Sequence, residues 1–155
     1  MNLTTYLNIL SEAVVYSNDI KYVYEIISTF SADEKQKFMG PRDFYDSSDF
    51  RKIKIDNKIP VAYLEAKIFN NRAKINIGTN SKYRNKNHMK DLFNKSVIDL
   101  SKLGVTKIIA GVSKQNDKSN NVLKKEGFSR INNKEKQKEY KFNNHWNVNY
   151  YELDI

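Results

Sequence analysis

The amino-acid sequence predicts an α/β (α+β) fold, in which helices flank a mixed, mostly antiparallel central sheet and extra helices precede it. Residues 50–78 contain three strand-like stretches separated by two short turns, which is typical of an antiparallel meander. A long amphipathic helix at 87–103 is followed by an apolar strand at 105–112. A strand, helix, strand unit of this length normally makes a right-handed parallel crossover. The 155-residue chain is expected to form one domain, residues 1–155.

The N-terminal part is predicted to be helical. Apolar residues recur at helical spacing over residues 3–16 and again over 20–30. Residues 31–34 have the pattern of a capping box, so a short third helix is expected to begin there. Gly40 and Pro41 should end it. No strand is expected before residue 50.

The meander should consist of three strands with the bounds 50–56, 59–69 and 72–78. Asparagine-containing pairs at 57–58 and 70–71 favour tight turns between them. These strands form the first half of the expected sheet.

The C-terminal part completes the expected sheet. The polar stretch 113–121 should open a short helix that ends at residues 126–127, where a glycine follows a glutamate. Residues 132–138 are expected to form a charged loop, and residues 140–142 and 145–155 a closing hairpin.

The composition argues against several classes of protein. There is no cysteine, so no disulfide and no thiolate zinc site can form, and with only two histidines we expect no metal site. No apolar run approaches the roughly 20 residues of a membrane span. The first residues lack the basic region of a signal peptide. We therefore expect a cytoplasmic protein without a membrane partner.

The positive charge is unevenly distributed. The formal net charge is +9, but residues 82–138 alone hold 15 basic and 5 acidic side chains. Such a local field favours anionic ligands. A lysine-rich solvated surface explains the same pattern, so both interpretations stay open. Because 22 of the 27 basic residues are lysine, base-specific reading of DNA by arginine is disfavoured.

The segment YRNKNHMKDLF, residues 83–93, links this positive charge to an anion site. Small polar and basic residues run directly into the start of the long helix. Backbone N–H groups at a helix N-terminus attract an anion whatever side chains they carry. We therefore expect an anion-binding turn here.

Two motifs on these elements resemble the GNAT superfamily of N-acetyltransferases, over roughly residues 50–131. Residues 79–89 correspond to its Arg-x-x-Gly-x-Gly turn, and residues 116–128 to its Asn-initiated helix ending in Gly-Phe. The resemblance implies acetyl-CoA as co-substrate, with its pyrophosphate at the turn and its pantetheine arm paired to a strand like a further strand. By resemblance, the cofactor-binding residues are Ile77, Thr79, Arg84, Asn85, Lys86, Asn87, His88, Met89, Asn116 and Ser119.

Three positions differ from the family's pattern. Asn87 and Met89 occupy the two usual glycine positions of the turn. Asparagine is the best non-glycine substitute for a left-handed conformation, whereas the bulk of methionine is expected to narrow the site. Leu123 stands where the family usually has a tyrosine that protonates the leaving thiolate, and leucine cannot donate a proton.

No catalytic residue follows from the sequence. Glu65 could point into the central cleft, but strand alternation favours a solvent-facing carboxylate. His88 is expected to act through its backbone N–H with an exposed ring. His145 suits packing better than chemistry, and Tyr140 is a candidate replacement acid that sequence cannot place.

The implied function is transfer of an acetyl group from acetyl-CoA to an amine acceptor of unknown identity: a small molecule, a peptide, a protein or a tRNA. The differences at Asn87, Met89 and Leu123 support a rival: a non-catalytic GNAT-fold protein with a binding or regulatory role. A nucleic-acid binder using the lysines of 82–138 is a third alternative. A homodimer also stays open.

Overall fold

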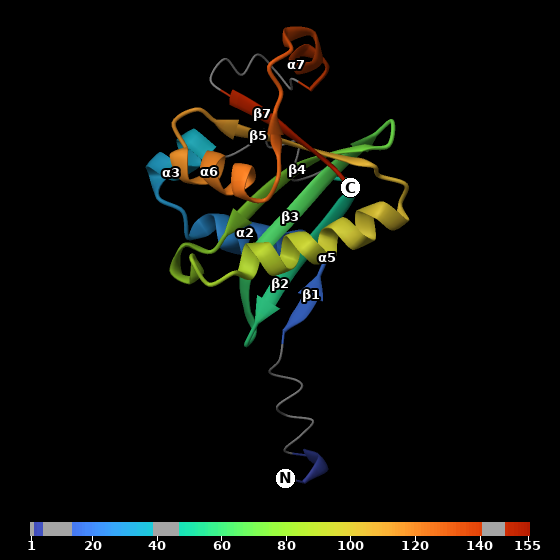
Figure 1. Cartoon of the computed structure of the whole chain (residues 1–155). Helices are drawn as coiled ribbons and strands as arrows, with labels where there is room; N and C mark the ends of the chain where they lie inside the picture. The colour runs from blue at the N-terminus through green and yellow to red at the C-terminus, as the bar shows by residue number, and fades with distance from the viewer. Residues whose placement is uncertain (1, 5–13, 39–46, 141–147) are drawn as a thin grey trace.

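The computed structural model describes residues 2–4, 14–38, 47–140 and 148–155, which form a central sheet with helices on both faces (Figure 1). The sheet has seven strands in the order β1-β2-β3-β4-β5-β7-β6. All neighbours are antiparallel except β4 and β5, which are parallel. The strands are β1 (Val15–Ser17), β2 (Phe50–Asp56), β3 (Ile59–Phe69), β4 (Arg72–Thr79), β5 (Lys107–Ser113), β6 (Ser129–Arg130) and β7 (Val148–Asp154).

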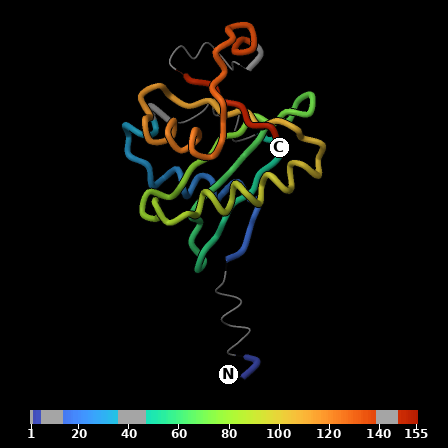
Figure 2. The backbone as a smooth tube through the Cα atoms, viewed as in Figure 1, coloured from blue at the N-terminus to red at the C-terminus, as the bar shows by residue number. Residues whose placement is uncertain are grey.

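The helices divide between the two faces of the sheet. Helix α5 crosses the face formed by β2, β3 and β4 (Figure 2), and α2 packs on the opposite face of β3 (Figure 1). The expected fold class is confirmed, including the parallel crossover through α5. The helices are α2 (Ile20–Ser28), α3 (Ala32–Phe38), α5 (His88–Lys102), α6 (Asp117–Lys125) and α7 (Lys134–Tyr140).

Both hairpins of the meander turn through residues with positive φ. Asn57 and Lys58 have φ of 48° and 66°, and Asn70 and Asn71 have φ of 47° and 63°. Positive φ at both central residues is the requirement of a type I′ turn, whose twist matches that of the flanking strands. The two expected turns and the bounds of β2 and β3 are confirmed.

The helix expected over residues 3–16 is wrong at its C-terminal end. Residues 15–17 form β1, which pairs with β2 from Val15–Ile55 to Ser17–Ile53. Residues 5–13 lie outside the described residues. Within β1 the Tyr16 hydroxyl donates to Asp91 of α5 at 2.7 Å. Pairing with an open sheet edge therefore outweighs the helical spacing, and a strand does precede residue 50.

Two C-terminal expectations are also wrong. Residues 132–138 are not a loop, since α7 begins beside Asn133, whose side chain accepts from the backbone N–H of Glu135. Tyr140 ends this helix rather than opening a strand, and residues 141–147, including His145, lie outside the described residues. The partners of β7 are β5 and the two-residue β6, which the sequence did not predict.

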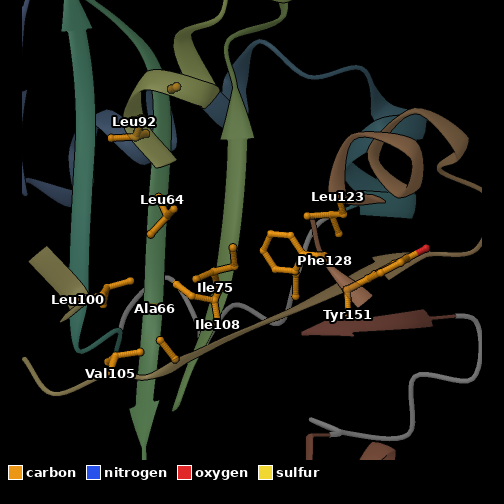
Figure 3. Close-up of a cluster of buried hydrophobic side chains, with 13 residues drawn as sticks. Leu64, Ala66, Ile75, Leu92, Leu100, Val105, Ile108, Leu123, Phe128 and Tyr151 are labelled. Atoms are coloured by element: carbon orange, nitrogen blue, oxygen red, sulfur yellow. The ribbon is translucent and has the colours of Figure 1, made fainter. Parts of the chain in front are cut away.

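The core has a large cluster under α5 and α6 and a smaller one under α2. Figure 3 shows the larger cluster, in which Leu92 and Leu100 of α5 lie with Leu64, Ile108 and Phe128. The smaller cluster joins Val23, Ile26 and Ile27 of α2 to Ile53, Ile55 and Tyr63. Because both faces of the sheet are covered, alternate residues of β3 are buried on either side.

The position of the Tyr63 ring on β3 requires a glycine at residue 78 of β4. Tyr63 is 1% exposed, and its ring lies over Gly78, the residue that it opposes across the strand pair. A Cβ atom on Gly78 would lie 2.6 Å from Tyr63 Cζ and 2.8 Å from its hydroxyl oxygen. No real Cβ tolerates such contacts, so any side chain here displaces the ring.

We expect Gly78→Ala to lower the free energy of unfolding by about 1–3 kcal/mol, the usual cost of overpacking a core. Gly104→Ala is the control, because Gly104 has φ +87° and nothing lies within 4 Å of the point that its Cβ would occupy. It should cost only the conformational strain, roughly 1 kcal/mol. Urea denaturation of both variants measures the difference. A Gly78→Ala protein no less stable than Gly104→Ala would contradict the placement of Tyr63.

Candidate functional site

The site begins where β4 and β5 stop pairing. The parallel ladder runs from Arg72–Lys107 to Ile75–Ala110 and then ends. Both strands continue, β4 to Thr79 and β5 to Ser113, without pairing to each other. The backbone groups of β4 that face β5 beyond Ile75 are therefore available to another partner. We call this region the divergence.

The turn after β4 leads from the divergence into α5. Asn80 is buried, and its amide donates to the carbonyl of Pro60 while its oxygen accepts from the backbone of Lys82. Asn85 and Asn87 follow with φ of 64° and 60°. Both therefore adopt the left-handed conformation for which glycine is usually chosen, as expected of Asn87.

Helix α5 begins at His88 with open backbone donors. Asn87 makes no side-chain capping bond, and the first intrahelical bond after it runs from Asp91 N–H to its carbonyl. The N–H groups of the first turn thus lack intrahelical acceptors. Met89 is half-buried and packs against the large core cluster, which gives its apolar side chain a structural role.

Arg84 binds the neighbouring helix. Its Nη1 lies 2.6 Å from Oε2 of Glu34 in α3, and its guanidinium lies over the ring of Phe30 at 5.3 Å. A hydrogen bond from the backbone N–H of Ser31, and then the contact with Arg84, lower the pKa of Glu34. The turn is thereby attached to the segment that carries α2 and α3.

Helix α6 flanks the divergence on the β5 side. Asn116 caps it, since its side-chain oxygen accepts from the backbone N–H of Ser119 at 3.1 Å. Lys118 reaches across to the turn before α5, where its ammonium donates to Asn85 Oδ1 at 2.8 Å. The structure therefore brings the N-termini of α5 and α6 to the same end of the divergence.

A buried polar network, missed in the sequence, fixes the end of β5 to α6. Asn120 donates to the carbonyls of Ser113 and Asn116, and its oxygen accepts from the Tyr151 hydroxyl at 2.7 Å and from Asn149. All four hydrogen-bonding positions of the amide are thereby used. The signal in the sequence was an asparagine inside a short helix, where it is a poor helix former.

Leu123 belongs to the core rather than to a site. It is 4% exposed and lies in the same cluster as Phe128 (Figure 3). The residue that replaces the expected tyrosine therefore has an apolar environment.

The expectation of an exposed His88 ring is wrong. His88 is 9% exposed, and its ring meets Tyr83 edge-on at 6.5 Å between centroids. Burial, followed by the nearby Lys54 ammonium, lowers the pKa of His88. Its Nδ1 has no hydrogen-bond partner among the described residues. The ring is covered because the first turn of α5 packs down on the sheet.

Glu65 is also not solvent-facing, contrary to expectation. Its side chain is fully buried, and its Oε1 accepts from Arg51 Nε at 2.7 Å. It opposes Asn76, the first β4 residue beyond the last β4–β5 pair. The Nδ2 atom of Asn76 is buried and finds no partner within the part of the chain that the structure describes. Strand alternation predicted that Glu65 faces solvent, but α2 covers this face of the sheet, so the side chain is buried.

Lys74 is a buried cation on the same face. It is 8% exposed, and its ammonium lies 5.3 Å from the centroid of the Tyr150 ring. Burial, with a smaller contribution from the Lys67 charge, lowers the pKa of Lys74 from 10.5 to about 7. Burial also raises the pKa of Tyr150. The chain therefore carries an amine at this face that is partly neutral at neutral pH.

Among the described residues, no cluster of three or more His, Cys, Asp or Glu could hold a metal ion. Among the same residues, no helix is both long and apolar enough to cross a membrane.

We expect Lys74→Met to stabilise the fold at neutral pH by up to a few kcal/mol, at about 1.4 kcal/mol per pKa unit. Between pH 7 and 10.5 the unfolded chain holds a proton that folded Lys74 releases, so wild-type stability rises with pH in this window. Below pH 7 the full penalty of burying the charge remains.

The gain from Lys74→Met should thus be largest at or below pH 7 and shrink toward pH 10. Urea denaturation at pH 6.5, 8 and 9.5 measures it, with the exposed Lys90→Met as the matched control. A gain that is absent, or equal at all three pH values, would contradict the burial of this amine.

The comparisons with known proteins agree with this geometry. A family model described as the acetyltransferase (GNAT) family matches residues 20–128. That span contains β2 to β5, the turn before α5, and α6. By sequence alone, the chain matches none of the curated proteins with which it was compared.

Solved structures share the fold at low identity. An acetyltransferase from Streptococcus agalactiae 2603 gives a TM-score of 0.75 at 15% identity, covering 93% of this chain and 99% of that one. The PaiA N-acetyltransferase from Thermoplasma acidophilum, in complex with coenzyme A, gives a TM-score of 0.69 at 13% identity, covering 92% of this chain and 99% of that one. The ribosomal-protein-S18-alanine N-acetyltransferase from Escherichia coli gives a TM-score of 0.64 at 16% identity, covering 92% of this chain and 94% of that one. With the family model matching well over half of its length, this chain belongs to the acetyltransferase (GNAT) family.

Proposed function

We propose that the protein is an N-acetyltransferase that moves an acetyl group from acetyl-CoA to an amine acceptor, with residues 1–155 acting as one domain. The observation that carries the proposal is the divergence of β4 and β5 beside the open N-terminus of α5. A free strand edge and a free helix start are the two backbone features that an extended amide arm with an anionic end can use. The solved structure of PaiA with coenzyme A supports this ligand class.

The turn before α5 suits the pyrophosphate. The backbone N–H groups of residues 85–89 supply donors, and the left-handed Asn85 and Asn87 let the chain curl into α5. Lys86 and Lys118 add positive charge on either side. Arg84 is adjacent, and an anion would compete with Glu34 for its guanidinium.

The open edge of β4 suits the pantetheine arm. The backbones of Ile77 and Thr79 lie beyond the last β4–β5 pair, where an amide-bearing ligand can pair as a further strand. Asn116 and Ser119 stand at the start of α6 on the opposite side. An arm that begins at residues 85–89 and follows β4 backwards therefore ends near Asn76 and Gly111.

The polar side chains at that end lie on one face. Glu65 and Asn76 are on the α2 face of the sheet, whereas Ile77, Ala110 and Val112 pack with the large cluster under α5 and α6. Glu65 and Asn76 offer an acceptor amine polar partners on the α2 face, so we place its approach there. Bound acetyl-CoA would supply the acetyl group as a thioester open to attack by a neutral amine.

The residues that move protons are not assigned. Leu123 removes the usual donor to the leaving thiolate, and Tyr140, which ends α7, stays a prediction for the replacement acid. The apolar setting of Leu123 is the specific observation that favours the second candidate, a non-catalytic GNAT-fold binding protein.

We expect acetyl-CoA to bind with a micromolar dissociation constant, at least about tenfold more tightly than ATP, because ATP offers phosphates but no pantetheine arm for β4. Calorimetric titration of both ligands at the same salt concentration measures this. Equal binding of both with a steep salt dependence would instead indicate a general polyanion surface, including one for nucleic acid.

An acceptor panel separates the enzyme from the binding protein once acetyl-CoA has been shown to bind. Release of free thiol from acetyl-CoA, measured with and without primary amines, is the readout. Binding without amine-dependent thiol release across small amines, peptides and proteins would favour the non-catalytic candidate.

We expect the left-handed conformation of Asn87 to matter for binding. Asn87→Gly should keep the affinity for acetyl-CoA, whereas Asn87→Val should weaken it by about tenfold, because a left-handed conformation costs a non-glycine residue roughly 1–2 kcal/mol. Asn57→Val is the matched control, since Asn57 has φ 48° in a turn outside the site. Titrations of the three variants decide the point. Equal affinity for acetyl-CoA in the two valine variants would contradict the assignment of the turn before α5 as the binding site.

A further inference from the structure

A buried amide joins the open end of β5 to α6 and β7. Asn120 is 7% exposed, and its Nδ2 donates to the carbonyls of Ser113 at 2.9 Å and of Asn116 at 2.8 Å. Its Oδ1 accepts from the Tyr151 hydroxyl at 2.7 Å and from Asn149 Nδ2 at 3.0 Å. We call these five residues the Asn120 network. One side chain thus connects three elements.

This network spans the part of β5 that β4 leaves unpaired. The ladder between β4 and β5 ends at Ala110, and Tyr151 of β7 is paired with Ala110. Asn149 of β7 is paired with Val112, and Ser113 is the last residue of β5. The contacts of the network therefore run from the last paired row of the ladder to the end of the strand.

The carbonyl of Ser113 is committed to α6. It accepts from the backbone N–H of Asn116 at 3.0 Å as well as from Asn120 Nδ2. A carbonyl oxygen has two lone pairs, so both are used and neither remains for β4. Ser113 also pairs with Val148 of β7, on the side of β5 away from β4. The end of β5 is thereby held toward α6 and β7.

The same side chain fixes the start of α6. Asn120 lies one turn after Asn116, and both its backbone N–H and its Nδ2 donate to the Asn116 carbonyl. Asn116 in turn caps α6 by accepting from the backbone N–H of Ser119. Asn116 and Ser119 are the two α6 residues that the proposed function places beside the pantetheine arm. Asn120 itself is buried, so its influence on the arm runs through these neighbours.

We propose that Asn120 is a positioning residue for the cofactor arm, an inference that rests on the proposed function. Its donor half binds β5 and α6 and holds both at the distance from β4 that an extended arm requires. Its acceptor half binds β7 and stabilises the fold. The two halves of one amide therefore have separate tasks, and substitutions can separate them.

A leucine at this position separates packing from positioning. Asn120→Leu fills the space but cannot donate to Ser113, and it leaves the buried Tyr151 hydroxyl without its acceptor, which destabilises the fold. Adding Tyr151→Phe removes that hydroxyl from a ring that already lies in the large apolar cluster, so much of the stability should return. The double variant should therefore fold without the tether to Ser113.

The experiment is calorimetric titration of two ligands into the full chain. Acetyl-CoA carries the arm, whereas the nucleotide half of coenzyme A, a phosphorylated ADP, lacks it. The double variant should bind acetyl-CoA about tenfold more weakly, the worth of one or two hydrogen bonds. Its affinity for the nucleotide half should not change, because Asn80 and Ser81 hold the turn before α5 from the β3 and α2 side. A purely structural role would not separate the two ligands.

Two single variants are the controls. Tyr151→Phe alone keeps the Asn120 donors to β5 and α6, so it should lower the midpoint of urea unfolding but keep the affinity for acetyl-CoA. Val105→Ala opens a cavity at a residue that is 3% exposed, just before β5 and at the end of that strand far from the divergence. It should lower the same midpoint and change neither affinity.

Each outcome decides between the two proposals. Wild-type binding of acetyl-CoA with an unchanged affinity in the double variant overturns the positioning role and leaves the proposed function standing. An equal loss for both ligands, or a loss in Tyr151→Phe as large as in the double variant, also overturns it. A double variant no more stable than Asn120→Leu alone contradicts the division of tasks and overturns it too. Absence of acetyl-CoA binding by the wild-type chain overturns both proposals.

Discussion

The candidate site depends on one constraint, the early end of the parallel ladder between β4 and β5. Two separate sets of hydrogen bonds hold the strand ends in place. On the β4 side, Asn80 binds back to the start of β3, and Ser81 binds Thr29 at the end of α2. On the β5 side, Asn120 fastens Ser113 to α6 and to Tyr151 of β7. Because each end is attached to a different neighbour, the strands do not close on each other.

Covering both faces of the sheet gives the site its unusual electrostatics. Glu65 and Lys74 are both buried on the α2 face, where an open antiparallel sheet would leave them in water. Arg51 binds the buried Glu65 carboxylate, and burial lowers the pKa of the Lys74 amine. Glu65, Asn76 and Lys74 therefore lie on one face of the sheet, whereas the other face combines the large apolar cluster with the hydrogen-bonded Asn120 network. This asymmetry gives the two faces different chemical roles.

Asparagine takes the place that glycine often has in such turns. Of the six non-glycine residues with positive φ among the described residues, five are asparagine: Asn57, Asn70, Asn71, Asn85 and Asn87. The short polar side chain tolerates the left-handed region better than most. The turn before α5 therefore keeps a curled backbone although its usual glycines are replaced. Its donors are main-chain groups, which the replacement does not remove.

The sequence by itself determined the features that local chemistry controls. The two asparagine turns, the bounds of β2 and β3, the long helix and the parallel crossover follow from periodicity and turn residues. By resemblance to the GNAT superfamily, it also implied a shared cofactor for Asn116 and the turn at residues 85–89.

Only the tertiary structure decided the rest. Strand β1 and the pairing of β7 between β5 and β6 depend on sheet edges that are far away in the chain. The burial of His88, Glu65 and Lys74 depends on layers packed over them, which alternation along a strand cannot reveal. Local propensity fixes an element when its partners are close in sequence. It fails where a distant edge or a covering helix sets the environment, and at this site such long-range contacts place the ionisable groups.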